Sequence, residues 1–110
     1  MSLSCVADDS DELKGLHYEP DLVHLTREVG TEVCAKWKLV ADELGLEHSI
    51  TDVIASIPND PLHHIREVFI HWSKQPSDSH PYTWATMIGV LRSKQIKELE
   101  LAKTLIQKFS

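Results

Sequence analysis

Histidine is the residue type in this 110-residue sequence that most suggests chemistry, with seven copies. His63, His64 and His71 fall in one stretch with helical periodicity. A zinc pair on a helix favours a spacing of four residues and needs further ligands that converge on it. His64 and His71 are seven residues apart, and no cysteine or carboxylate obviously completes a ligand set. We therefore expect surface histidines and no metal site.

The sequence offers no clear catalytic nucleophile. Cys34 is flanked by helix-forming residues and has no identifiable base, so we expect a buried small hydrophobe there. The chain contains no glycine-rich phosphate loop and no Gly-x-Ser-x-Gly motif. A single small domain also leaves little room for a substrate pocket beside its core. The sequence predicts a protein that is not an enzyme and uses no cofactor.

Charge is distributed unevenly along the chain. The net charge is −6, of which residues 1–21 carry −5 and residues 22–110 carry −1. No basic stripe of the kind that binds phosphates is present, so nucleic acid is not an expected partner. No apolar run reaches the roughly 18–20 residues that span a bilayer, and no signal segment opens the chain. Two cysteines form no disulfide framework, which fits a cytoplasmic location.

Two parts of the folded region have opposite charge. Residues 42–67 carry a net charge of −5, and we expect Asp42, Glu43, Glu47 and Asp52 to be exposed. Residues 92–110 carry a net charge of +3. The bases of this second part are Arg92, Lys94, Lys97, Lys103 and Lys108. Such poles could steer a head-to-tail contact, although two solvated helix faces that happen to differ would give the same pattern.

Two apolar residues lie on the outer side of their expected helices. Leu39 falls roughly opposite the stripe that contains Val40 and Ala41, and Ile70 points away from Phe69. Single exposed apolar residues are common on protein surfaces. A Leu or Ile surrounded by charged residues is also what a small docking patch would contain.

The elements that position these residues are expected to be helices, because apolar residues repeat every three to four positions. The clearest stretch is Trp37–Leu46, which should end at Gly45, since a residue without Cβ adopts the left-handed cap conformation cheaply. A first helix should begin after Asp21 as its N-cap, and Gly30-Thr31 should bend or break it. No stretch alternates with a period of two, so the sequence predicts an all-α fold.

Further signals mark where later helices begin. Ser49, with Asp52 three residues later, forms a weak capping box for the third helix. Asp60 before Pro61 is the clearest start, since a capping acid precedes proline at the first helical position. The fifth helix is expected to begin at Pro81. The apolar stripe expected for the third helix comprises Ile50, Val53, Ile54 and Ile57. The expected core includes Trp37, Leu44, Phe69, Trp72, Trp84 and Leu91.

Residues 1–20 read as an acidic disordered leader and residues 21–110 as one folded domain.

A resemblance to a known family rests on residues spread along most of the chain. They are Trp37-x-x-Val40-Ala41-x-x-Leu44-Gly45-Leu46, Ile54, Ile65-Arg66-Glu67-x-Phe69-x-x-Trp72, Thr83-Trp84, Leu91-Arg92 and Leu99-x-x-Ala102. In this order and at these separations they resemble the death domain, over about residues 21–109. The resemblance implies a six-helix antiparallel bundle of the death-fold type. Trp72 favours the death domain over the related caspase-recruitment and death-effector domains.

The resemblance implies a function in association rather than catalysis. Death domains dock on one another, with the same or different partners, and assemble cytoplasmic signalling complexes. A head-to-tail contact needs two different complementary patches on one molecule. The residues expected to form them are Leu39, Asp42, Glu43, Glu47, Asp52, Arg66, Ile70, Lys94 and Lys97. The alternative is a structural death-like domain of a larger scaffold or cytoskeletal protein, which has this fold and makes no homotypic contact.

Overall fold

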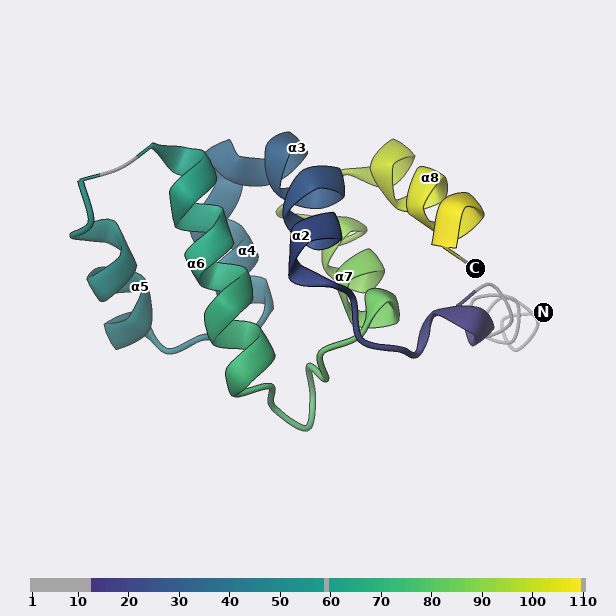
Figure 1. Cartoon of the computed structure of the whole chain (residues 1–110), viewed down its shortest axis with the longest axis horizontal. Coiled ribbons are helices and arrows are strands. Elements are labelled where there is room, and N and C mark those ends of the chain that lie inside the picture. The colour runs from purple at the N-terminus through teal and green to yellow at the C-terminus, as the bar shows by residue number, and fades with distance from the viewer. Residues whose placement is uncertain (1–12, 59, 110) are drawn as a thin grey trace.

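Every regular element in the part of the chain that the structure describes, residues 13–58 and 60–109 of a computed structural model, is helical (Figure 1). The elements are η1 (Lys14–Leu16), α2 (Leu22–Leu25), η2 (Thr26–Gly30), α3 (Thr31–Val33), η3 (Cys34–Lys36), α4 (Trp37–Glu43), α5 (His48–Ala55), α6 (Pro61–Lys74), α7 (Trp84–Leu91) and α8 (Leu99–Phe109). The η1 and η3 segments are 3₁₀ turns, and η2 is a π-helical turn. The expected all-α class is confirmed.

The helix does not break at Gly30-Thr31, although its type changes there from the π turn η2 to α3. Gly30 has helical backbone angles, φ −57° and ψ −42°, so α2, η2 and α3 follow one another without a break. The helical angles end at Val33, with φ −118° and ψ 9°, and the 3₁₀ turn η3 then leads into α4. The glycine serves packing, because a Cβ at Gly30 would lie 3.2 Å from Cγ2 of Ile65 on α6.

The turn after α4 forms where the sequence predicts it. Gly45 has a φ of +81°, which favours glycine because a side chain would clash there. The N–H of Gly45 donates to the carbonyl of Asp42, and the N–H of Leu46 donates to that of Ala41, both at 3.0 Å. This pair of bonds is a Schellman motif. It closes α4 and leads into α5 within four residues.

The predicted details of α5 are wrong in two respects. The helix begins at His48 with Glu47 at its N-cap, two residues before the expected N-cap Ser49, and no side chain caps it. Of the expected stripe only Ile54 is fully buried, whereas the side chain of Val53 is 60% exposed. The physical reason is position: α5 lies at one end of the molecule beside α6, so little of its surface is covered (Figure 1).

The longest helix, α6, is the centre of the packing, since η2, η3, α4 and α5 all contact it. Its start agrees with the sequence: Pro61 is the first residue, and an Asp60 carboxylate oxygen accepts the N–H of His63 at 3.0 Å. Its fully buried residues are Ile65, Val68, Phe69 and Trp72.

The fifth helix begins later than expected. The structure starts α7 at Trp84 rather than at Pro81, because Thr83 takes the N-cap and its hydroxyl accepts the N–H of Thr86 at 3.2 Å. The next helix, α8, packs on α7, and the rings of Trp84 and Phe109 stack with centroids 4.3 Å apart.

The folded part starts before residue 21. Leu16 is fully buried and belongs to the hydrophobic core. The Tyr18 hydroxyl donates to the Phe109 carbonyl at 3.0 Å, and the Tyr82 hydroxyl donates to the Pro20 carbonyl at 2.7 Å. The leader expected over residues 1–20 is therefore too long by residues 13–20, while residues 1–12 lie outside the described part.

All the side chains expected in the core are buried: Trp37, Leu44, Phe69, Trp72, Trp84 and Leu91. Among the described residues, no helix has both the length and the apolar character needed to cross a lipid bilayer.

A candidate docking groove and an acidic surface

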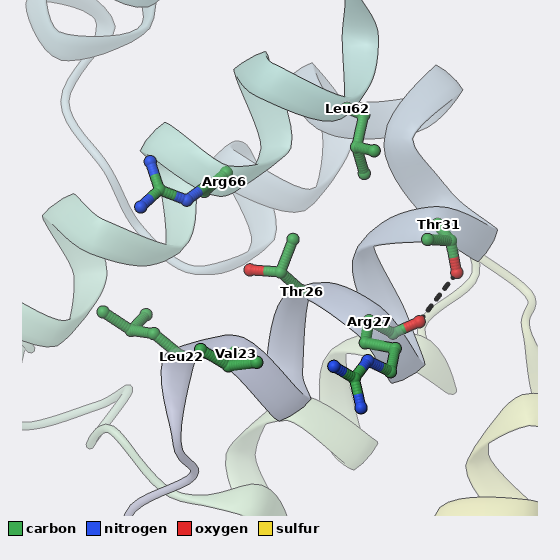
Figure 2. Close-up of a pocket in the computed structure, with 7 residues that line it drawn as sticks. All are labelled: Leu22, Val23, Thr26, Arg27, Thr31, Leu62 and Arg66. Atoms are coloured by element: carbon green, nitrogen blue, oxygen red, sulfur yellow. Dashed lines mark hydrogen bonds between the residues drawn. The ribbon is translucent and has the colours of Figure 1, made fainter.

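A groove lies between α6 and the helical segment made of α2, η2 and α3. Seven residues line it, and its volume is about 360 Å³. They are Leu22, Val23, Thr26, Arg27, Thr31, Leu62 and Arg66. Figure 2 shows that α2, η2 and α3 supply one wall and α6 the other. We call these seven residues the docking groove.

The floor of the docking groove is apolar. Val23 is 59% exposed and Leu62 is 39% exposed, whereas Leu22 is half-buried. Leu62 precedes the buried Ile65 by three residues on α6, yet its own side chain is not covered. It is exposed because it lies in the first turn of the helix, where α2 and η2 stop short of covering it (Figure 2). Exposed apolar side chains that share one groove differ from isolated ones, because a partner can bury them together.

Two arginines flank this floor. Arg27 comes from η2 and Arg66 from α6, and both side chains are exposed. Their guanidinium groups lie towards opposite ends of the groove in Figure 2. Within residues 13–58 and 60–109, neither guanidinium forms an ion pair. Arg27 was not among the predicted site residues, since only the tertiary packing of η2 on α6 places it in the groove.

Arg27 also lies in the π-helical turn. A π turn has poorer hydrogen bonding than an α-helix and is often found at functional sites. The turn spans Thr26–Gly30, and the Thr31 hydroxyl donates to the carbonyl of Arg27 at 2.8 Å. The local irregularity therefore coincides with the wall of the docking groove.

A second surface surrounds the turn between α4 and α5. Asp42 and Glu43 close α4, Glu47 is the N-cap residue of α5, and Asp52 lies in α5. Glu43 is half-buried and the other three are exposed. None of the four forms an ion pair in the described part of the chain. We call these four residues the acidic surface.

Apolar residues accompany both surfaces. Leu39 is 39% exposed and lies one turn before Asp42 and Glu43 on α4. Val53, which follows Asp52, is exposed as well. Ile70 is half-buried and lies one turn beyond Arg66 on the same side of α6. The two outward apolar residues predicted from the sequence are thus each beside a charged surface.

Two of the basic residues near the C-terminus are paired with carboxylates of the chain. Lys108 lies 2.7 Å from a carboxylate oxygen of Glu28, and Lys103 lies 3.9 Å from one of Glu100. Of these two carboxylates, Glu28 alone lies outside residues 92–110, because Glu100 is already counted in their net charge of +3. Lys94 and Lys97 are exposed on the connection between α7 and α8, and they do not line the groove that contains Arg66.

No known protein-family model, curated protein or solved structure matches this chain. The docking groove and the acidic surface are therefore the observations that support a function.

One histidine that we expected at the surface takes a structural position. His64 is half-buried, its ring centroid is 4.9 Å from that of Trp37, and its Nε2–H donates to the Ile57 carbonyl at 2.9 Å. This bond holds the end of the α5 segment to α6. Cys34 is half-buried rather than buried. In the described residues, no group of three or more potential metal-ligating side chains converges.

Proposed function

We propose that this chain is a non-catalytic interaction module of the death-domain type that associates with copies of itself or with related domains to assemble cytoplasmic signalling complexes. The sequence resemblance and the all-helical structure support the fold type. In this proposal the continuous segment α2–α3 is the first of six helices, and α4, α5, α6, α7 and α8 are the other five.

The observation that carries the proposal is that one molecule presents two different surfaces of opposite charge. Arg27 and Arg66 of the docking groove have no carboxylate partner among the described residues. The carboxylates of the acidic surface likewise have no cationic partner there. A head-to-tail contact uses two unlike patches and can repeat from one molecule to the next.

The chemistry of the two surfaces fits such a contact. Guanidinium groups bind carboxylates through two parallel hydrogen bonds, which fixes the geometry of the contact as well as its charge. Val53 or Leu39 of the incoming molecule would cover the exposed floor residues Val23 and Leu62. Burial of apolar side chains supplies affinity, while the charges supply specificity and a faster association rate.

Light scattering at low and high salt tests the proposal with two neutralised variants. The Arg27→Gln/Arg66→Gln variant retains the acidic surface, and the Glu43→Gln/Glu47→Gln variant retains the groove. The wild type should assemble at low salt and dissociate at high salt, because exposed charges are screened. Each variant alone should remain monomeric. An equimolar mixture should form dimers and nothing larger, since only one intact groove can meet one intact acidic surface.

A matched control removes two exposed cations outside the groove, in a Lys74→Gln/Lys103→Gln variant that should assemble like the wild type. If the wild type stays monomeric at every salt concentration, homotypic association is excluded. A structural domain without such contacts would then be the better description. If all the variants assemble like the wild type, association occurs through another surface.

A further inference from the structure

A second groove lies where two connections of the chain meet, the segment before α2 and the loop between α6 and α7 (Figure 1). Its volume is about 510 Å³, against about 360 Å³ for the docking groove, and the two grooves share no lining residue. Aromatic and proline side chains form much of its wall, and two carboxylates accompany them. We call it the tyrosine–proline groove, after its residues Tyr18, Tyr82, Pro76, Pro81, Glu19 and Asp78.

The two tyrosines of this groove are held in fixed positions. The hydroxyl of Tyr18 donates to the carbonyl of Phe109, and that of Tyr82 donates to a carbonyl of the segment before α2. The Tyr82 ring also lies edge-on to that of Trp72, with centroids 4.8 Å apart. Even so, Tyr18 is 45% exposed, and both prolines of the groove are exposed. A partner therefore meets a wall that is already formed, which reduces the entropy lost on binding.

The charge of this groove is negative. Glu19 and Asp78 are exposed, and neither forms an ion pair with a residue of the described ranges 13–58 and 60–109. No lysine or arginine is among the residues that line the groove. The negative charge also acts on the aromatic wall, since burial and the charges of Glu19 and Asp21 raise the pKa of Tyr82 to about 12. A cationic side chain of a partner is the complement of this groove.

We propose that the tyrosine–proline groove binds an extended, proline-rich segment of a partner protein that carries an arginine. The prolines of the segment pack on the exposed ring of Tyr18 and on the two prolines of the groove. The guanidinium group pairs with Glu19 or Asp78. Because this site is separate from the docking groove, the inference does not rest on the proposed function.

A proline-rich segment suits the wall of this groove for physical reasons. Such a segment is already extended as a polyproline II helix, so it loses little conformational entropy on binding. Its apolar rings dock in grooves lined by aromatic side chains. Proline has no N–H group, so the segment brings carbonyls that need donors and few donors that need acceptors. The exposed ring of His17, which also lines the groove, can donate to one of these carbonyls.

Arginine is the cation that fits this groove best. Its planar guanidinium group stacks on an aromatic ring and forms two parallel hydrogen bonds with a carboxylate. The ammonium group of lysine is compact and more strongly hydrated, so it gives up more hydration when it enters a groove. We therefore expect a segment with arginine to bind more tightly than the same segment with lysine.

NMR titration of the isotope-labelled full chain tests the proposal with a short polyproline peptide that ends in arginine and is blocked at both termini. Saturable shifts of backbone amide signals should occur at Tyr18, Asp78 and Thr83, and not at Val23 and Thr26 of the docking groove. Replacing the arginine of the peptide with glutamine should weaken binding about three- to tenfold, because an exposed charge-assisted contact is lost.

Variants of the two carboxylates identify the partner of the arginine. Glu19→Gln/Asp78→Asn should weaken binding of the arginine peptide about three- to tenfold and leave binding of the glutamine peptide unchanged. The matched control Glu32→Gln/Glu100→Gln removes two exposed acids outside the groove, and it should bind the arginine peptide like the wild type.

Variants of Tyr18 test the aromatic wall. Tyr18→Leu removes the ring and should weaken binding of both peptides. Tyr18→Phe keeps the ring and should bind both like the wild type. Neither variant can form the hydrogen bond to the Phe109 carbonyl, so Tyr18→Phe controls for its loss.

Three results would overturn the proposal. The first is the absence of saturable shifts at the groove. The second is equal binding of a peptide in which alanines replace the prolines, which would indicate a simple site for a cation. The third is equal weakening by the two double-acid variants, which would indicate general attraction to a chain of net charge −6. None of these results depends on whether the chain assembles in the light-scattering test.

Discussion

The backbone N–H of Trp84 donates a hydrogen bond to the carbonyl oxygen of Tyr18, 3.1 Å away. This bond joins the N-terminal segment to the first residue of α7, more than sixty residues later in the chain. Leu16, two residues before Tyr18, is fully buried. The segment that precedes α2 is consequently part of the folded body and closes the end of the core near α7 and α8.

Replacing Leu16 with alanine should therefore destabilise the whole domain. Loss of a fully buried leucine side chain leaves a cavity and typically costs about 2–5 kcal/mol of unfolding free energy. The matched variant Leu39→Ala removes a leucine that is 39% exposed, and its cost should be well under half as large. Urea unfolding followed by tryptophan fluorescence measures both. Equal effects of the two substitutions would place Leu16 outside the core.

Gly45 should tolerate substitution poorly because of its backbone angle. Its φ is +81°, and an added Cβ would lie 3.2 Å from Nδ1 of His80. Gly45→Ala is expected to cost about 1–2 kcal/mol of stability. Gly45→Asn should cost less of this backbone strain, since asparagine adopts the left-handed conformation more readily than alanine. Thermal unfolding of the three proteins gives the order of stability, and an alanine variant as stable as the wild type would contradict the strained-turn explanation.

Tyr82 should make stability depend on pH in the alkaline range. Burial, together with the charges of Glu19 and Asp21, raises the pKa of Tyr82 from 10.0 to about 12. The unfolded chain therefore loses this proton at a lower pH than the folded chain does. The stability due to the buried phenol is complete below about pH 10 and is lost as the pH rises towards about 12.

The Tyr82→Phe variant isolates this contribution. It removes the hydrogen bond to the Pro20 carbonyl, which should lower stability by about 1 kcal/mol at neutral pH. It should also flatten the decrease in stability at alkaline pH. Urea midpoints measured at about pH 9 and about pH 11 test both effects, and ultraviolet absorbance of the phenolate reports the titration itself. A wild type and variant with parallel pH profiles would refute the assignment to Tyr82.

Assembly should depend on the groove arginines rather than on the lysines of the α7–α8 connection. A Lys94→Gln/Lys97→Asn variant removes two exposed charges outside the docking groove, and asparagine suits position 97 because Lys97 has a φ of +54°. We expect it to assemble like the wild type in low-salt light scattering. Arg66→Gln alone removes the same type of charge inside the groove and should weaken assembly. The reverse order of effects would move the docking surface to the α7–α8 connection.

The sequence alone determined the helical class, the ends of several helices and most of the core. These features depend on interactions within a few residues: Gly45 ends α4, and Asp60 with Pro61 starts α6. The periodicity of apolar residues likewise identified Phe69, Trp72 and Trp84 as buried. Apolar residues three to four positions apart lie on one face of a helix, and this holds for any element that packs against that face.

Only the tertiary structure decided which predicted faces are covered. Val53 satisfies the same periodic rule as Ile54 but is exposed, because α5 has a single major neighbour at the end of the molecule. Leu16 has no periodic context, yet α8 and the start of α7 enclose its segment. Arg27 and Arg66 are far apart in the sequence, and the packing of η2 on α6 brings them to one groove. Burial and site geometry depend on neighbours distant in sequence, and local spacing carries no information about them.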